Sequence, residues 1–237
     1  MNFLAHYVIA SRYLTPAAPL SSYVVGTALP DLLPLASRRS RLRPVLVNHN
    51  PALTADEAAL RAGVLVHLAT DTAFHKTAAF IEAQTRVSEI FSKTTFEGIH
   101  VRRFFLAHVL TELALDAVLL RAHFDIAEDF YTAFAEADFD AVKRWTEAAV
   151  GKPLPELPAV LKRFAQSRYL FHYADDEGVA TGLSLLCARA RQDTFDGANH
   201  TRLVEVVGQA VVALAGKADV MLRETADAMI HPPTTSK

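Results

Sequence analysis

Two apolar segments of the sequence carry histidines and carboxylates at a spacing of four residues. The members of these rows are His67, Asp71 and His75 in GVLVHLATDTAFHK, and His108, Glu112 and Asp116 in FFLAHVLTELALDAVLL. This spacing places the three side chains of each row on one face of a helix. Imidazoles and carboxylates buried without partners are costly. The two rows are therefore predicted to satisfy one another or to bind cations.

Helix geometry limits what each row can bind. The first and last members of a row lie roughly 12 Å apart along the axis, whereas neighbours lie about 6 Å apart. One ion held at about 2.1 Å can therefore contact neighbours but not a whole row. Two helices crossing face to face can hold two ions, or one ion with a surrounding shell of orienting partners.

The ligand types narrow the metal and the reaction. Imidazole and carboxylate without thiolate suit Zn²⁺, Mn²⁺, Fe²⁺ or Ni²⁺. Such an ion lowers the pKa of bound water and polarises a phosphoryl oxygen, so hydrolysis of a phosphoester or an amide is the expected chemistry. A di-iron oxygenase would use similar ligands, but the usual Glu-x-x-His pair on two helices is missing. The rows can also be read as internal hydrogen-bonded ladders of a non-enzymatic interaction protein.

Further candidate residues lie near the start of the chain. Asp31 follows Pro30 in GTALPD, and its spacing alone is also typical of a turn or N-cap residue. His6 lies in an apolar first helix, where a lone histidine is commonly a hydrogen-bonded core residue. A basic run follows Asp31, with arginines that can form either a solvated loop or a docking patch for an acidic partner. These are Arg38, Arg39, Arg41 and Arg43.

The elements that would position these residues are all helices. Apolar residues recur with helical period along most of the chain, and alternating strand-like runs are absent. The sequences Thr54–Glu57 and Thr94–Glu97 resemble capping boxes that open helices. The predicted helices span 2–14, 20–29, 54–80, 94–123, 159–171, 175–191 and 201–229, with two more between 127 and 150. The second is predicted to end at Pro30, because the residue before a proline disfavours the helical conformation.

The composition is that of one globular domain. Of the 237 residues 51% are hydrophobic, and 24 basic against 26 acidic residues give a net charge of −2, which carries no nucleic-acid signature. The single cysteine, Cys187, excludes an internal disulfide framework. The apolar start lacks the features of a signal peptide, and no stretch reaches a membrane span. We expect a soluble cytoplasmic protein with one all-α domain over residues 1–230 and a disordered tail over 231–237.

Five blocks of the sequence, in order over most of the chain, resemble the acyl carrier protein phosphodiesterase family. They are MNFLAH (1–6), GTALPD (26–31), AGVLVHLATD (62–71), the acidic pair Glu112 and Asp116, and YLFHYAD (169–175) with the later Arg189. The resemblance implies a multi-helix bundle like that of HD-type phosphohydrolases. It also implies removal of the 4′-phosphopantetheine arm from holo-acyl carrier protein, typically with Mn²⁺.

By this resemblance, the metal and water-handling residues extend beyond the two rows. They are His6, Asp31, His67, Asp71, Glu112 and Asp116, with Asp31, Asp71 and Asp116 as the candidate catalytic carboxylates. The chain departs from the family at Leu68-Ala69-Thr70, where members carry arginines, and it adds His75 and His108. The site is thus richer in metal ligands and poorer in phosphate-binding cations, which leaves a phospholipase-C-like hydrolase of a small or lipid-like substrate as an alternative.

Overall fold

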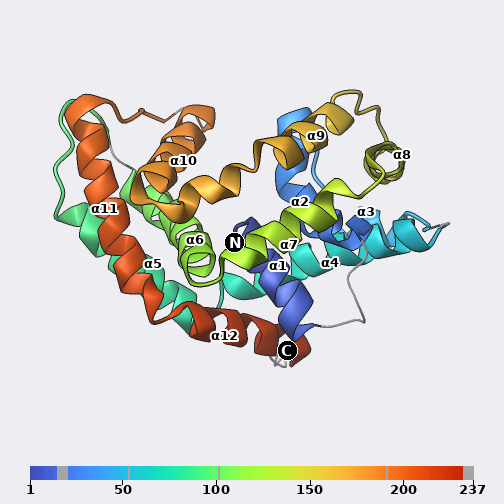
Figure 1. The fold of residues 1–237 in the computed structure, drawn as a ribbon, viewed down its shortest axis with the longest axis horizontal. Helices are drawn as coiled ribbons and strands as arrows, with labels where there is room; N and C mark the ends of the chain where they lie inside the picture. Colours follow the sequence, from blue (N-terminus) through green and yellow to red (C-terminus); the bar gives the residue numbers. More distant parts are fainter. Residues whose placement is uncertain (15–20, 53, 101, 191, 232–237) are drawn as a thin grey trace. The chain divides into compact units, whose positions relative to one another are not determined.

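The computed structural model describes residues 1–14, 21–52, 54–100, 102–190 and 192–231, and this part of the chain contains helices and no strand (Figure 1). The α-helices are α1 (Phe3–Val8), α2 (Ser21–Ala36), α3 (Pro44–His49), α4 (Ala55–Phe74), α5 (Ala78–Ser92), α6 (Arg103–Ala122), α7 (Phe124–Ala135), α8 (Phe139–Val150), α9 (Leu157–Ser167), α10 (Asp176–Arg189), α11 (Gly197–Ala215) and α12 (Ala218–Ile230). A π-helical turn, η1 (Ile9–Tyr13), follows α1, and a 3-10 helix, η2 (Tyr169–Ala174), precedes α10. The predicted all-α class is confirmed.

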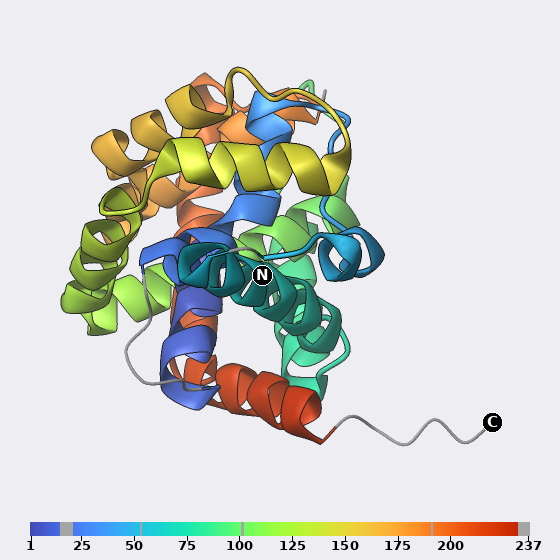
Figure 2. The same ribbon diagram turned by 90° about the vertical axis from the view of Figure 1, so that its right-hand side faces the viewer.

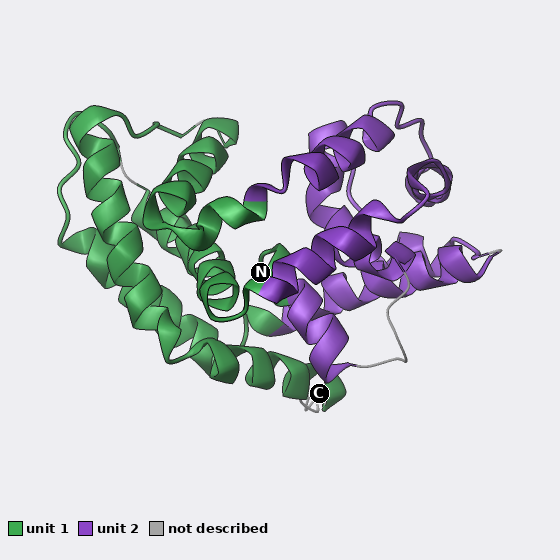
Figure 3. Ribbon diagram, viewed as in Figure 1, with its two compact units in different colours: residues 1–5, 74–124, 170–237 green, residues 6–73, 125–169 purple. Residues whose placement is uncertain are grey.

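The described chain divides into two compact units, each assembled from separate segments (Figure 3). Unit 1 contains residues 1–5, 74–124 and 170–237, and unit 2 contains residues 6–73 and 125–169. The single domain expected over residues 1–230 stays a prediction. The part of the expected tail at 232–237 lies outside the described residues.

In unit 1, α6 is the central helix. It packs against α5, α10, α11 and α12, and the α5, α6 and α11 contacts can be followed in Figures 1 and 2. Leucines on several of its faces are buried, among them Leu110, Leu113 and Leu115. A helix that is apolar on most sides is typical of the middle of a helical core. His108, Glu112 and Asp116 therefore lie on a helix that is surrounded by other helices.

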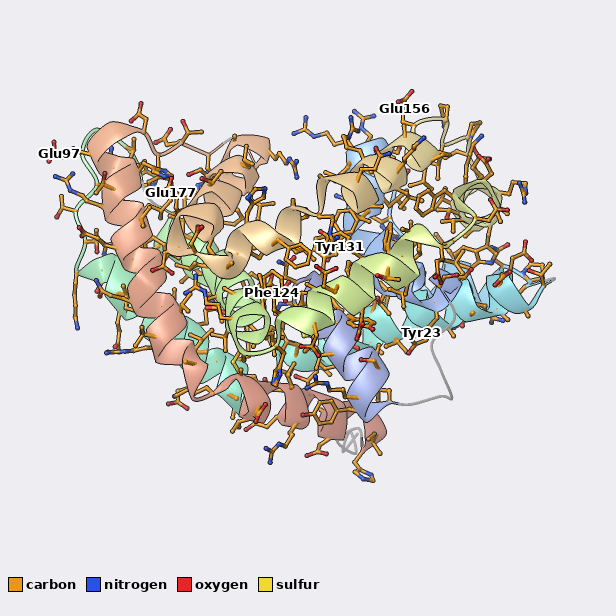
Figure 4. The ribbon with its side chains drawn as sticks, viewed as in Figure 1. Tyr23, Glu97, Phe124, Tyr131, Glu156 and Glu177 are labelled. Atoms are coloured by element: carbon orange, nitrogen blue, oxygen red, sulfur yellow. The ribbon has the colours of Figure 1, made fainter. Side chains whose placement is uncertain are left out.

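In unit 2, aromatic rings of α7 and α9 form the centre of the core. Phe164 of α9 lies 6.1 Å from Phe130 and 5.1 Å from Phe134 between ring centroids. The guanidinium of Arg168 lies 5.7 Å from the ring centroid of Tyr131, whose place on α7 is labelled in Figure 4. These edge and tilted arrangements stabilise packed aromatic rings beyond the area that they bury. The helices α2 and α8 also pack against α9.

The helix end predicted at Pro30 is wrong, because α2 continues through Pro30 and Pro34 to Ala36. Each interior proline removes one helical hydrogen bond and costs about 3 kcal/mol. Leu29, Leu32 and Leu33 beside the prolines are at most 1% exposed, and fully burying a leucine contributes roughly 1.5–3 kcal/mol. Core burial therefore offsets the local cost, and Asp31 lies inside the helix instead of at its end.

The first predicted capping box, Thr54–Glu57, is confirmed, but the helix that it begins is shorter than predicted. The amide of Glu57 donates to the Thr54 hydroxyl at 3.1 Å, and the amide of Thr54 donates to the Glu57 carboxylate at 3.2 Å. The predicted continuation to residue 80 is wrong, since α4 ends at Phe74. The hydroxyl of Thr77 accepts from the amide of Phe80 at 3.2 Å and begins α5. His75 consequently lies in the turn between two helices.

The second capping box, predicted at Thr94–Glu97, is wrong, because α6 begins only at Arg103. The amide of Glu97 donates to the side chain of Asn199 at 2.9 Å, and its carboxylate pairs with Arg202 at 2.7 Å. Glu97, labelled in Figure 4, thus contacts the first turns of α11. A long-range pairing has replaced the local cap that the sequence pattern indicates.

Two other predicted helices are each interrupted in the structure. The first, expected over residues 2–14, becomes α1 followed by the π-helical turn η1. The last, expected over residues 201–229, is divided into α11 and α12. The start predicted at Asp175 is confirmed, since its carboxylate accepts from the amide of Gly178 at 2.7 Å and caps α10.

Candidate metal centre

Side chains of the metal-binding types gather in two groups within the described chain. In each group the ligand atoms of three residues lie within 4.8 Å of one another. The histidine–aspartate group is His6, Asp31 and His67, and the histidine–glutamate group is His75, His108 and Glu112. The first lies wholly in unit 2 and the second wholly in unit 1. All six residues belong to the predicted metal ligands.

In the histidine–aspartate group, three helices contribute one ligand each. His6 of α1 and His67 of α4 stack with their ring centroids 3.8 Å apart, and both are buried. Nε2 of His67 lies 3.7 Å from Oδ1 of Asp31 on α2, whose side chain is 41% exposed. The two imidazoles are thus enclosed, while the carboxylate reaches the surface.

The backbone sets the chemistry of His67. Its Nδ1 lies 2.7 Å from the carbonyl oxygen of Thr27, which can only accept a hydrogen bond. Nδ1 therefore carries a proton, so that a neutral ring would present the lone pair of Nε2 toward the Asp31 carboxylate. Two acceptors that face each other need a proton or a cation between them. This backbone-fixed tautomer is the arrangement seen behind metal-binding histidines, so the group fits a divalent ion.

Two glycines allow α2 and α4 to approach closely beside this group. A Cβ atom added to Gly63 would lie 2.2 Å from the carbonyl oxygen of Tyr23, and one added to Gly26 would lie 2.4 Å from that of Leu60. Gly63 precedes His67 by one turn, and Gly26 precedes Thr27 in sequence. The bond between Thr27 and His67 therefore depends on two positions that have no side chain.

In the histidine–glutamate group, three nitrogens converge on one oxygen. Nε2 of His75 lies 2.9 Å from Oε1 of Glu112, and Nε2 of His108 lies 3.3 Å from it. The amino group of Met1 donates to the same oxygen at 2.8 Å. The two imidazole rings stack at 4.8 Å between centroids. Both rings thus direct the nitrogen that can bind a metal toward the carboxylate, so this group fits a cation as well.

The electrostatics of Glu112 keep it ionised. Burial by itself raises the pKa of this carboxyl group, but the charged amino group of Met1 and the hydrogen bonds from His108 and His75 outweigh burial. Together they hold the pKa of Glu112 well below its ordinary value. An ionised carboxylate beside two imidazoles is a suitable set of donors for a divalent ion.

Asp116, predicted as a ligand and a catalytic residue, lies in neither group. It is fully buried, and its two oxygens accept hydrogen bonds from the amides of Leu4 and Ala5 at 3.0 and 2.9 Å. Burial raises the pKa of Asp116 to about 7, although these amides and the amino group of Met1 act to lower it. Its position satisfies the first amides of α1, which have no partner inside that helix.

The remaining predicted residues are members of neither group. Asp71 follows His67 by one helical turn on α4 and is half-buried. The four arginines of the predicted docking patch are all exposed and lie at the end of α2 and before α3. Arg41 donates to the carbonyl oxygens of Arg38 and Ser40, which orders that short segment.

The sequence did not predict three further groups that contact the candidate ligands. These are the Thr27 carbonyl, the amino group of Met1 and Gln84, whose Oε1 lies 3.4 Å from Nδ1 of His108. The glycines at 26 and 63 are the one signal that was available, since both stand within the quoted blocks. Helical spacing also placed His67 and His75 in one row of a single helix, whereas α4 ends at Phe74 and His75 lies in the turn that follows.

Comparisons of the chain with known proteins found no related protein. The chain matches no model of a protein family, and no curated protein or solved structure is significantly similar to it. No helix of the described residues is long and apolar enough to cross a membrane.

Proposed function

We propose that the chain is a metal-dependent hydrolase of phosphodiesters with a helical fold akin to that of HD-type phosphohydrolases. The observation that carries the proposal is the repeated ligand set, two imidazoles and one carboxylate within 4.8 Å, in both groups. Sets of two histidines and one carboxylate that leave a coordination position open are typical of hydrolytic zinc sites. Mn²⁺ is the metal that the family resemblance implies, with Zn²⁺ and Fe²⁺ as the other candidates.

In the histidine–aspartate group, the proposed role of each residue follows from how far its side chain is exposed. A bound divalent ion supplies electrophilic activation of water and of a phosphoryl oxygen. His67, held by Thr27, and the enclosed His6 fix the buried side of the histidine–aspartate group. Asp31 is its solvent-facing member, so its carboxylate is the group that can take a proton from the attacking water. Asp71, one turn beyond His67, is the second candidate for this role.

Two single substitutions and one control test the proposal. His67→Ala and His108→Ala should each abolish the share of phosphodiesterase activity that its own group supplies, and the double variant should lower the activity about 100-fold, since a lost ligand removes the ion or misplaces it. His123→Ala, which removes an exposed imidazole outside both groups, should keep full activity. The panel should contain nitrophenyl phosphodiesters and holo-acyl carrier protein, each with Mn²⁺, Zn²⁺ and Fe²⁺. Activity that survives both ligand substitutions would refute the site.

An acyl carrier protein substrate would need a basic docking surface, since these carriers are strongly acidic. The exposed run Arg38, Arg39, Arg41 and Arg43 is the proposed surface. Arg39→Glu with Arg43→Glu should raise the KM for holo-acyl carrier protein about tenfold at low salt, and added salt should shrink the difference. Arg163→Glu, an exposed change on α9, is the matched control. An unchanged KM would leave the small phosphodiester as the substrate.

The same ligand set favours one alternative reaction. Two histidines and one carboxylate also form the facial triad of iron oxygenases. Such an enzyme would bind Fe²⁺ selectively and consume oxygen with an organic substrate, whereas a hydrolase works without oxygen. Loss of activity under anaerobic conditions separates the two. A non-enzymatic protein whose polar rows are internal ladders would instead show the same melting temperature with and without chelator.

A further inference from the structure

A groove of about 530 Å³ in unit 1 opens beside the histidine–glutamate group. Its lining includes His75, Ile81, Gln84, Thr85, Ser92 and Phe104. His75 belongs to both the groove and the candidate metal centre, and Gln84 contacts His108. Phe104 precedes His108 by one turn on the same face of α6, a separation of about 6 Å. We name this hollow the α5 groove.

We infer that the substrate of the histidine–glutamate group carries an unbranched apolar chain, which lies in the α5 groove. The inference rests on the proposed function and specifies its substrate class. A phosphoryl group at a divalent ion held by His75, His108 and Glu112 would place the substituent of the ester next to Phe104 and Ile81. The groove volume lies within the range of ligand-binding pockets for small molecules.

The length and direction of the groove suit an extended chain. Ile81, Thr85 and Ser92 occupy one face of α5, at spacings of four and seven residues. From Ile81 to Ser92 the helix rises about 17 Å. The groove therefore runs along the helix away from His75, which precedes α5 in the chain.

The groove presents more apolar than polar surface to a substrate. The side chains of Phe104 and Ile81 are 77% and 55% exposed, so two large apolar side chains of the groove face solvent beside the polar centre. The hydroxyls of Thr85 and Ser92 donate to the carbonyl oxygens of Ile81 and Glu89 in their own helix. These hydroxyls are thus already engaged.

Ser88 and Glu89 also line the groove. The Glu89 carboxylate accepts a hydrogen bond from Arg86 at 2.9 Å. An apolar chain over Ile81 and Phe104 therefore need not displace that ion pair.

A chain-length series on the metal-loaded protein tests the inference. The substrates are methyl and decyl nitrophenyl phosphate, used below the concentration at which the decyl ester forms micelles. The value of kcat/KM should be at least about tenfold higher for the decyl ester, because each buried methylene adds to binding. Phe104→Ser should reduce that ratio at least about threefold. Val212→Ser on α11, where the side chain is 78% exposed outside the groove, should leave the ratio unchanged.

Binding of product analogues separates this inference from the proposed function. Calorimetry on the Zn²⁺-loaded protein should find decyl phosphate bound at least about tenfold more tightly than methyl phosphate, with the gain reduced in Phe104→Ser. Tighter decyl binding without any hydrolysis would refute the phosphodiesterase and support the groove. Equal binding of the two phosphates, or equal loss of the gain in Val212→Ser, would overturn the inference.

Discussion

His67 illustrates how one backbone atom decides what a side chain can do. The carbonyl oxygen of Thr27 fixes the proton on Nδ1 and leaves Nε2 directed at Asp31. A histidine in a helical row can be placed on a face from the sequence, but its tautomer depends on a carbonyl group of another helix. The sequence therefore predicts His67 as a candidate ligand, but it does not show the hydrogen bond that would direct Nε2 at a cation.

Asp116 shows the opposite case, a predicted ligand that is held by the backbone. Its two hydrogen bonds run to Leu4 and Ala5, more than a hundred residues away in sequence. Spacing of four residues from Glu112 put Asp116 in the same row, yet this row continues into the packed interior of unit 1. Nothing in the local sequence distinguishes a carboxylate that binds a metal from one that caps a distant helix.

The titration of Asp116 should make stability depend on pH. Because its pKa rises from 3.8 to about 7 on folding, the folded protein retains a proton that the unfolded chain releases in this window. The free energy of unfolding should therefore fall by a few kcal/mol as the pH rises from about 4 to about 7, at about 1.4 kcal/mol per pKa unit. Urea titrations in chelator at several pH values measure this.

Asp116→Asn supplies the control for that titration. The amide resembles the protonated carboxyl group and does not ionise, so the difference in stability between wild type and variant should change with pH in the same window. A difference that stays constant from pH 4 to pH 7 would contradict the raised pKa of Asp116.

At the scale of elements, the crossing of α2 and α4 shapes the histidine–aspartate group. Gly26 and Gly63 meet the opposite backbone directly, and the bond from His67 to Thr27 forms one turn further along α4. The same helices show where sequence rules fail. The helix α2 continues past its two prolines because its leucines are buried. The helix α4 ends at Phe74, and the hydroxyl of Thr77 caps the start of α5. The periodicity of apolar residues predicts that these helices exist, whereas tertiary packing determines where they end.

Gly63→Ala should disrupt this crossing. In most helix interiors the change stabilises a protein, since alanine has the higher helix propensity. Here the new Cβ atom would lie 2.2 Å from the Tyr23 carbonyl oxygen, so we expect about 2 kcal/mol of destabilisation in urea unfolding and weaker metal binding.

Gly216→Ala is the matched control for the crossing. An added Cβ atom at Gly216 meets nothing within 4 Å, and its φ of −84° is allowed to any residue. Its stability should stay within about 0.5 kcal/mol of wild type. If Gly63→Ala were as harmless as Gly216→Ala, the close approach of the two helices would be refuted.

At the scale of the whole molecule, the candidate ligands are distributed between two units. Each group takes all three of its ligands from one unit, so a substitution in one leaves the other set complete. The helical class and four of the six candidate ligands, His67, His75, His108 and Glu112, follow from helical period and residue type, whereas His6 and Asp31 are implied by the family resemblance. Their sorting into two groups depends on the turn at His75 and on contacts between residues far apart in sequence, which periodicity does not encode.

Metal content per chain tests the central claim most directly. Elemental analysis and calorimetric titration with Mn²⁺ and Zn²⁺ should find two ions in the wild type, in line with the two groups. One ion should remain in His67→Ala and one in His108→Ala, none in the double variant, and two in His123→Ala. A wild-type protein that binds no ion, or the same metal content in all five proteins, would contradict both sites.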